Sequence, residues 1–369
     1  MSNKTISEFK PPQSCVSSSY FSLNTGVYAP FELYSRAKTT VDNISGIDMS
    51  IAIMIFLALF VAGSLTYAYA YRGQARWTGF GEYVRKGWPL FTPFNCLLYI
   101  FTKPRARPAI MDMTQFPELK ALQDNWEVIR KEAIELMAVG GFDQISNKDS
   151  ASYYDIGFRT FYKYGWTKFY LNWYGYTHES AKRTCPKTLE ILSKIPEVNG
   201  AMFSVLPPGG QLTRHLDPVA CSLRYHLGLD TPNDDRCYIS IDDTKYSWRD
   251  GEPLLFDVTF LHFAHNDADK PRLILMCDVD RPMSWFGHIL NWPYKLLMKA
   301  TVVPNTDEDK RGFANRTFST LVPLLEKSKR LKETNLPAYK ALKYTVNGTL
   351  MLIVAALVWL VVEFFIWLF

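Results

Sequence analysis

The sequence predicts a mainly β domain of the jelly-roll type, with flanking α-helices, held between an N-terminal and a C-terminal transmembrane helix. Two observations predict this fold class. Short apolar runs with a period of two follow one another from Ala201 to Val279, which is typical of strands in a sandwich or barrel. Two long apolar stretches, residues 49–71 and 346–369, lie on either side of these runs.

The composition limits the classes of function. The chain has 369 residues, enough for one large domain or two modest ones besides membrane segments. Its net charge is only +5, and no basic run is interleaved with aromatic residues, so we expect no nucleic-acid partner. Aromatic residues make up 15% of the chain, and Trp and Tyr favour the interface between membrane and water.

The N-terminal part predicts a membrane anchor. Residues 1–46 are polar and irregular, and we interpret them as a loosely structured extension. Residues 47–71 contain an uncharged apolar stretch that exceeds the roughly 20 residues a transmembrane helix needs. Residues 72–110 bring several Arg and Lys side chains and a short apolar patch, and we expect an interfacial segment there. This charge bias places the segment after the first span in the cytoplasm.

The central domain is expected over residues 111–285. The spacing of apolar residues predicts an amphipathic helix over 116–137 and a short helix over 187–195. From residue 201 the period changes to two, and turns rich in Pro, Gly, Asn and Asp break the chain into short runs. These runs predict strands over residues 201–206, 211–217, 222–229, 237–242, 253–258 and 272–279.

The C-terminal part predicts a second anchor. Residues 286–343 are expected to form an interfacial and basic helical segment, and residues 344–369 a transmembrane helix. Basic residues on the near side of this span again place the central domain in the cytoplasm. We therefore expect a multi-pass membrane protein with both termini on the opposite side of the membrane from the domain.

Three side chains within the predicted strands could bind a metal ion. His215 and Asp217 are two residues apart, so on an extended strand their side chains point to the same face. With His262 from another strand they would form two histidines and one carboxylate, the ligand set of non-haem Fe(II) oxygenases. Spacing alone leaves a second interpretation open, in which these are separate histidines of the core.

Basic side chains near these residues suit a dicarboxylate. Arg272 follows the second histidine by ten residues, and a guanidinium group binds a carboxylate through two parallel hydrogen bonds. Arg224 and His226 share one face of a predicted strand and would point into an apolar interior. Burying both groups there is costly without a partner, and a bound dicarboxylate would supply one.

Residues from about 90 to 282, roughly half the chain, resemble the lipid A 2-hydroxylases, a membrane branch of the aspartyl/asparaginyl β-hydroxylase family. The matching phrases are FTPFNCLLYIF, FPELKALQDNWEVIRKEA, GWTKFYLNWY, CPKTLEILSKIP, AMFSVLPPGGQL, DPVACSLRYHLGL, KYSWRDGE and CDVDRP. The resemblance implies a double-stranded β-helix that uses Fe(II), 2-oxoglutarate and O2.

The resemblance also implies roles for individual residues. His215 and His262 match the metal-binding histidines, and Asp217 stands where the animal peptidyl hydroxylases have glycine, so we expect it to be a third ligand. Its alternative role is that of a capping or supporting carboxylate before Pro218. Residues matching the 2-oxoglutarate site are Arg272 and Ser204 at the distal carboxylate and Arg224 and His226 near the proximal one.

The implied function is hydroxylation at C2 of a fatty-acyl chain of lipid A, at the cytoplasmic face of the inner membrane. Two alternatives remain within the same chemistry, namely another acyl lipid such as an ornithine lipid and a peptidyl Asp/Asn β-hydroxylase. A third alternative is a membrane-anchored binding protein with an inactive barrel.

Overall fold

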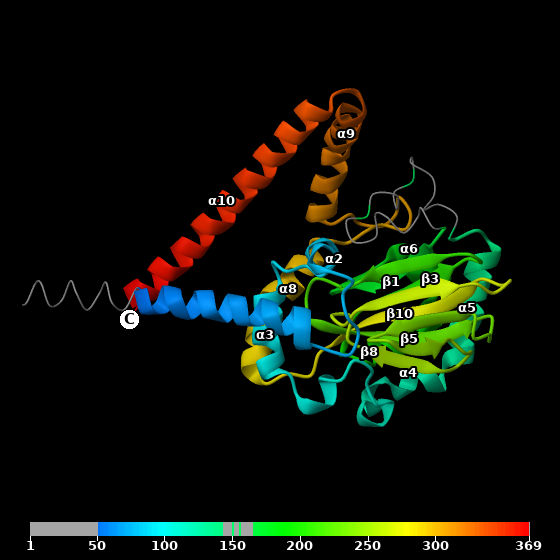
Figure 1. The fold of residues 1–369 in the computed structure, drawn as a ribbon. Coiled ribbons are helices and arrows are strands. Elements are labelled where there is room, and N and C mark those ends of the chain that lie inside the picture. Colours follow the sequence, from blue (N-terminus) through cyan, green and yellow to red (C-terminus); the bar gives the residue numbers. More distant parts are fainter. Residues whose placement is uncertain (1–50, 143–149, 151–154, 156–164, 369) are drawn as a thin grey trace, which may run out of the picture. The chain divides into compact units, whose positions relative to one another are not determined.

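The computed structural model describes residues 51–142, 150, 155 and 165–368 (Figure 1). The chain divides into two units, Met1–Phe56 and Leu57–Phe369, and every site described below lies in the second unit. The predicted polar extension, residues 1–46, lies outside the described residues.

Two antiparallel sheets form the centre of the second unit. The larger sheet has the strand order β2–β1–β3–β10–β5–β8, and the smaller one the order β4–β9–β6–β7. Figure 1 shows most strands of the larger sheet side by side in this order. Its bounds are β1 Thr167–Trp173, β2 Tyr176–Thr177, β3 Val198–Leu206, β5 Ser222–Asp230, β8 Pro253–Phe256 and β10 Arg272–Asp280. The smaller sheet consists of β4 Gln211–His215, β6 Cys237–Ile241, β7 Thr244–Ser247 and β9 His262–Asn266.

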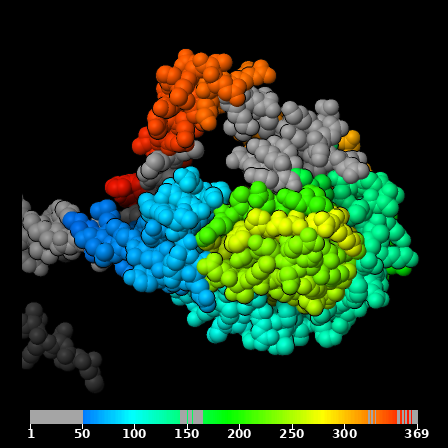
Figure 2. Space-filling view, turned by 45° about the vertical axis from the view of Figure 1, so that its right-hand side comes forward, coloured from blue at the N-terminus to red at the C-terminus, as the bar shows by residue number. Residues whose placement is uncertain are grey.

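The larger sheet separates two cores. On β10, Leu275 and Cys277 face helices, whereas Ile274 and Met276 alternate with them and pack with residues of the smaller sheet such as Ile239. Because side chains of a strand alternate between faces, one buried strand supplies both cores. The β-rich jelly-roll fold is therefore confirmed, and Figure 2 shows the yellow and yellow-green strand residues packed into one continuous block.

Helices cover the outer face of the larger sheet. The helices are α4 Lys120–Asp124, α5 Trp126–Ala138, α6 Glu179–Thr184 and α7 Pro186–Ser193. The single helix predicted over 116–137 is divided instead, because Asn125 leaves helical geometry at φ −112° and ψ 19°. Apolar side chains of both pieces, Leu122 and Ile129, are still fully buried in the outer core.

The predicted first anchor is helical. Within the described part of the chain, Ile51–Tyr71 is the one helix that passes both tests for crossing a membrane, length and apolar composition. After it come α2 Phe80–Lys86 and α3 Thr92–Phe101, and α3 buries Leu98 against Met283 while exposing Ile100.

The C-terminal part is helical as well. Its helices are α8 Trp285–Lys299, α9 Phe313–Thr334 and α10 Leu336–Leu368. The last of these runs through the predicted second span, whose crossing of a membrane stays a prediction.

One carboxylate between two arginines joins distant parts of the second unit. Asp257, fully buried after β8, lies 2.9 Å from Arg72 and 2.7 Å from the equally buried Arg281. Burial acts to raise the pKa of the Asp257 carboxyl, but the charges of Arg281 and Arg72 outweigh it and hold this pKa well below its usual range. The stabilising contribution is therefore complete above a pH of about 4 and is lost as the pH falls toward the depressed value.

Asp257→Asn is expected to lower the free energy of unfolding at neutral pH by about 3–5 kcal/mol, because two buried guanidinium groups lose their shared counter-charge. Thermal unfolding of the full chain in detergent measures this change. Asp269→Asn is the control, since Asp269 is 94% exposed and its one ion pair among the described residues is with exposed Arg236 at 3.3 Å. Equal midpoints for the two variants would contradict the role given to Asp257.

Candidate metal and co-substrate site

The structure brings the three predicted ligands together. His215 at the end of β4 pairs with His262 at the start of β9, and their ring centroids lie 4.3 Å apart. Asp217 lies two residues beyond the end of β4, yet its Oδ1 is 3.6 Å from His215 Nε2. Ligand atoms of all three residues lie within 4.8 Å of one another, close enough to hold one ion. These residues are called the triad below.

Backbone contacts orient both histidines of the triad. His215 Nδ1 lies 2.8 Å from the Thr213 carbonyl oxygen, and His262 Nδ1 lies 2.9 Å from that of Phe260. A carbonyl oxygen only accepts hydrogen bonds, so each Nδ1 carries the proton and each Nε2 presents a lone pair. Burial lowers the pKa of His262 to about 4, which keeps this ring neutral at physiological pH. The two Nε2 atoms and the Asp217 carboxylate face one another, and this donor set suits a divalent metal ion.

Arg224 orients the carboxylate of the triad. Its Nη2 lies 3.3 Å from Asp217 Oδ2, and its Nε lies 2.9 Å from Asp278 Oδ1 on the neighbouring strand β10. The carboxylate thus has one oxygen on a guanidinium group and the other turned toward His215, an arrangement typical of groups that support metal ligands. Arg224 thus contacts both Asp217 and Asp278, and Asp278 is a residue that sequence reasoning missed.

Arg272 lies at the other end of β10, on the same inner face as Asp278. Unlike Arg224, it contacts no carboxylate of the described residues. Its side chain is fully buried, and burial lowers its pKa to about 10. Nη2 lies 3.3 Å from Ser204 Oγ, while Nε and Nη1 have no acceptor among the described residues. The ring of Trp248 stacks 4.4 Å from the guanidinium carbon. A buried guanidinium with two unused donors fits a carboxylate ligand.

His226 lies on β5 between these two groups. It is buried against Phe256, with ring centroids 5.1 Å apart, and burial followed by the charges of Arg272 and Arg224 lowers its pKa well below the usual range. Its Nδ1 accepts a hydrogen bond from Trp248 Nε1 at 3.3 Å. The neutral ring therefore carries its proton on Nε2, the opposite tautomer to the triad histidines, and offers a donor rather than a lone pair.

Comparison with known proteins agrees with this geometry. Residues 123–282 match the family model described as "Aspartyl/Asparaginyl beta-hydroxylase". An "Ornithine lipid ester-linked acyl 2-hydroxylase" of Rhizobium tropici is 30% identical over half of this chain and 65% of its own length. The human "Aspartyl/asparaginyl beta-hydroxylase" is 33% identical over 46% of this chain and 22% of its own.

Among solved structures, a Pseudomonas putida prolyl-4-hydroxylase aligns over 43% of this chain and 87% of its own, with 16% identity and a TM-score of 0.29. The chain thus spans less than two thirds of the length of the two relatives it matches. The family model and the two relatives show that the part of the chain containing the barrel is similar to the aspartyl/asparaginyl β-hydroxylase family.

Proposed function

We propose that this protein is an Fe(II)- and 2-oxoglutarate-dependent dioxygenase that hydroxylates an acyl chain of a membrane lipid. The observation that carries the proposal is the pairing of the triad with a buried arginine, Arg272, two of whose donor nitrogens have no acceptor among the described residues. His215, His262 and Asp217 would hold the metal, and Arg272 with Ser204 would bind the far carboxylate of 2-oxoglutarate. The Nε2 proton of His226, between them, suits the near end of the same molecule.

The two co-substrates, 2-oxoglutarate and O2, account for the atoms and electrons of the proposed reaction. Bound iron, 2-oxoglutarate and O2 together supply the oxidant: one oxygen atom enters a C–H bond as hydroxyl, the other ends in succinate, and CO2 leaves. The protein contributes by positioning the reacting groups and by excluding water from them. Arg224 fixes the Asp217 carboxylate, the two backbone carbonyls fix the histidines, and Trp248 with Phe256 keeps the interior apolar.

Two surfaces support a lipid substrate. The helix Ile51–Tyr71 is apolar and exposed along most of its length. On successive turns, α8 exposes large apolar side chains between 54% and 64%, namely Trp285, Ile289, Trp292 and Leu296. An exposed apolar stripe with two Trp is typical of a helix that lies at a membrane interface. Iron in its reduced form and 2-oxoglutarate are both available in the cytoplasm, which is where we place the domain at the bacterial inner membrane.

The preferred substrate is lipid A, with hydroxylation at C2 of a fatty-acyl chain. Ornithine lipid is the second candidate, which the name of the Rhizobium tropici relative favours. Mass spectrometry of membrane lipids from bacterial cells with and without the protein tests the proposal. We expect one added oxygen on an acyl chain, and the lipid that carries it decides between the two candidates. Unchanged lipids, with the protein present in the membrane, would contradict the proposed function.

A further inference from the structure

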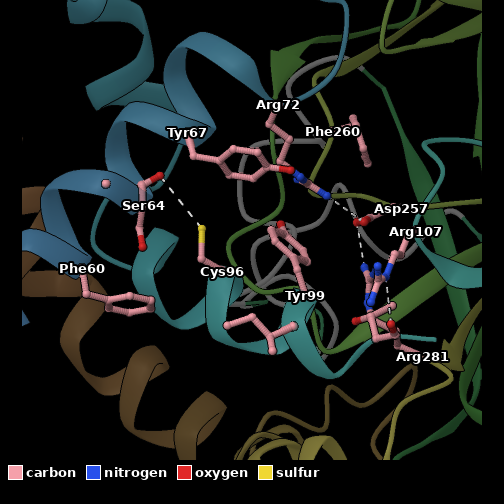
Figure 3. A pocket seen from close by; sticks show the side chains of 13 residues that line it. Phe60, Ser64, Tyr67, Arg72, Cys96, Tyr99, Arg107, Asp257, Phe260 and Arg281 are labelled. Atoms are coloured by element: carbon pink, nitrogen blue, oxygen red, sulfur yellow. Dashed lines mark hydrogen bonds and ion pairs between the residues drawn. The ribbon is translucent and has the colours of Figure 1, made fainter. Parts of the chain in front are cut away.

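A cavity of about 520 Å³, a size typical of ligand pockets, is lined in part by Asp257 and Phe260, which precede His262 in the chain. Its first wall comes from the apolar helix Ile51–Tyr71, which contributes Phe60, Gly63, Ser64 and Tyr67. Figure 3 shows Phe60, Ser64 and Tyr67 on one side and a group of arginine side chains around Asp257 on the other. The cavity therefore has an apolar wall from a membrane-type helix and a charged wall from the domain.

The charged wall carries an excess of positive charge. Of the charged residues that line the cavity, three are arginines, Arg72, Arg107 and Arg281, and one is an acid, Asp257. Three positive charges and one negative charge leave an excess of two. Asp257 is shared by Arg72 and Arg281, whereas exposed Arg107 is held through Nε by the Thr102 carbonyl oxygen at 3.0 Å. The Nε of Arg281 is buried and has no acceptor among the described residues. This wall suits an anion.

The floor of the cavity is also the support of the triad. The ring of Phe260 lies 3.9 Å from the Arg72 guanidinium carbon, and its carbonyl oxygen is the one that orients His262. In the same segment the Val258 carbonyl oxygen accepts a hydrogen bond from the Asp217 backbone N–H at 2.9 Å. A molecule in the cavity would therefore rest against the segment 257–261, which positions two of the three triad residues.

We propose that this cavity binds an acyl lipid with an anionic headgroup, with the headgroup against Arg107 and Arg281 and the acyl chains along the helix Ile51–Tyr71. Because one wall of the cavity is apolar, a purely ionic ligand would fit it poorly. The arginines of the other wall favour an anionic lipid over a zwitterionic one. This binding requires neither iron nor 2-oxoglutarate. Its failure is therefore distinguishable from a failure of the proposed hydroxylation.

Two substitutions act on opposite walls. A Cβ atom at Gly63 would have no heavy atom within 4 Å, so Gly63→Leu places a side chain in open space and obstructs the cavity without a clash. Leucine also suits a helix better than glycine, which protects the fold of the variant. Arg107→Gln removes one positive charge from an exposed position. Ala62→Leu is the matched control, because Ala62 is an exposed neighbour on the same helix and is not part of the cavity lining.

The experiment is native mass spectrometry of the full chain in detergent, titrated with phosphatidylglycerol or with phosphatidylcholine of the same acyl chains. We expect phosphatidylglycerol to bind at least about tenfold more tightly, as one charge-assisted contact predicts. Gly63→Leu and Arg107→Gln should each weaken its binding by about tenfold or more, and Ala62→Leu should not. Equal binding of the two lipids, or unchanged binding of phosphatidylglycerol by both cavity variants, would overturn the proposal. Thermal unfolding in detergent verifies that each variant is folded.

Discussion

His262→Ala is expected to lower lipid hydroxylation by more than about 100-fold while the protein still accumulates in membranes. Changes in groups that merely support metal ligands cost about 10- to 100-fold, and loss of a ligand should cost more. The substitution removes one of two lone pairs that face each other across strands β4 and β9. The measurement is the ratio of hydroxylated to unmodified lipid at matched protein abundance.

The control for this variant is His265→Ala on the same strand. Burial alternates along β9, so His265 lies on the opposite face from His262 and stacks on Tyr238 with ring centroids 5.7 Å apart. We expect hydroxylation close to that of the unsubstituted chain. If His262→Ala retained activity similar to His265→Ala, His262 would not be a metal ligand.

Arg272→Met is expected to have opposite effects on co-substrate binding and on stability. A charge-assisted pair contributes about 1.5–3 kcal/mol, so the KM for 2-oxoglutarate should rise by about 10- to 150-fold. Without co-substrate, the same change replaces a buried charge, two of whose nitrogens have no acceptor in the described part of the chain, by an apolar side chain of similar length. The melting temperature of the protein without 2-oxoglutarate should therefore stay equal or rise.

These two measurements separate a binding role from a structural one. A purely structural arginine would lower the melting temperature when it is lost and leave the KM for 2-oxoglutarate unchanged. Arg130→Met is a useful comparison, because Arg130 forms a half-exposed ion pair with Asp230 at 3.0 Å and should change neither quantity much. An unchanged KM for Arg272→Met would remove Arg272 from the co-substrate site.

Sequence periodicity predicted the strands whose two faces are both apolar. β3 and β10 show this best, because alternate residues of each strand enter the outer and the inner core. β9 gave a weaker pattern, since its inner positions hold His262, Ala264 and Asn266 instead of large apolar residues. The edge strand β7 is polar and exposed at Thr244, so neither alternation nor hydrophobicity marked it.

The site was predictable in its residue types but not in its cross-strand partners. The alternation of side chains along a strand predicted that Arg224 points to an inner face. Its position opposite Asp278 depends on the register of β5 with β10. Likewise Asp217 reaches the triad from beyond the end of β4, where strand alternation no longer applies, because its backbone N–H is held by Val258. Register and loop conformation depend on tertiary packing, which a single sequence does not encode locally.

The most direct test of the central claim is iron binding by the purified full chain under anaerobic conditions, with and without 2-oxoglutarate. The account predicts one tightly bound Fe(II) per chain, and the double variant His215→Ala/His262→Ala should bind none at the same metal concentration. Iron bound equally by both proteins, or by neither, would contradict a metal site built from His215, Asp217 and His262.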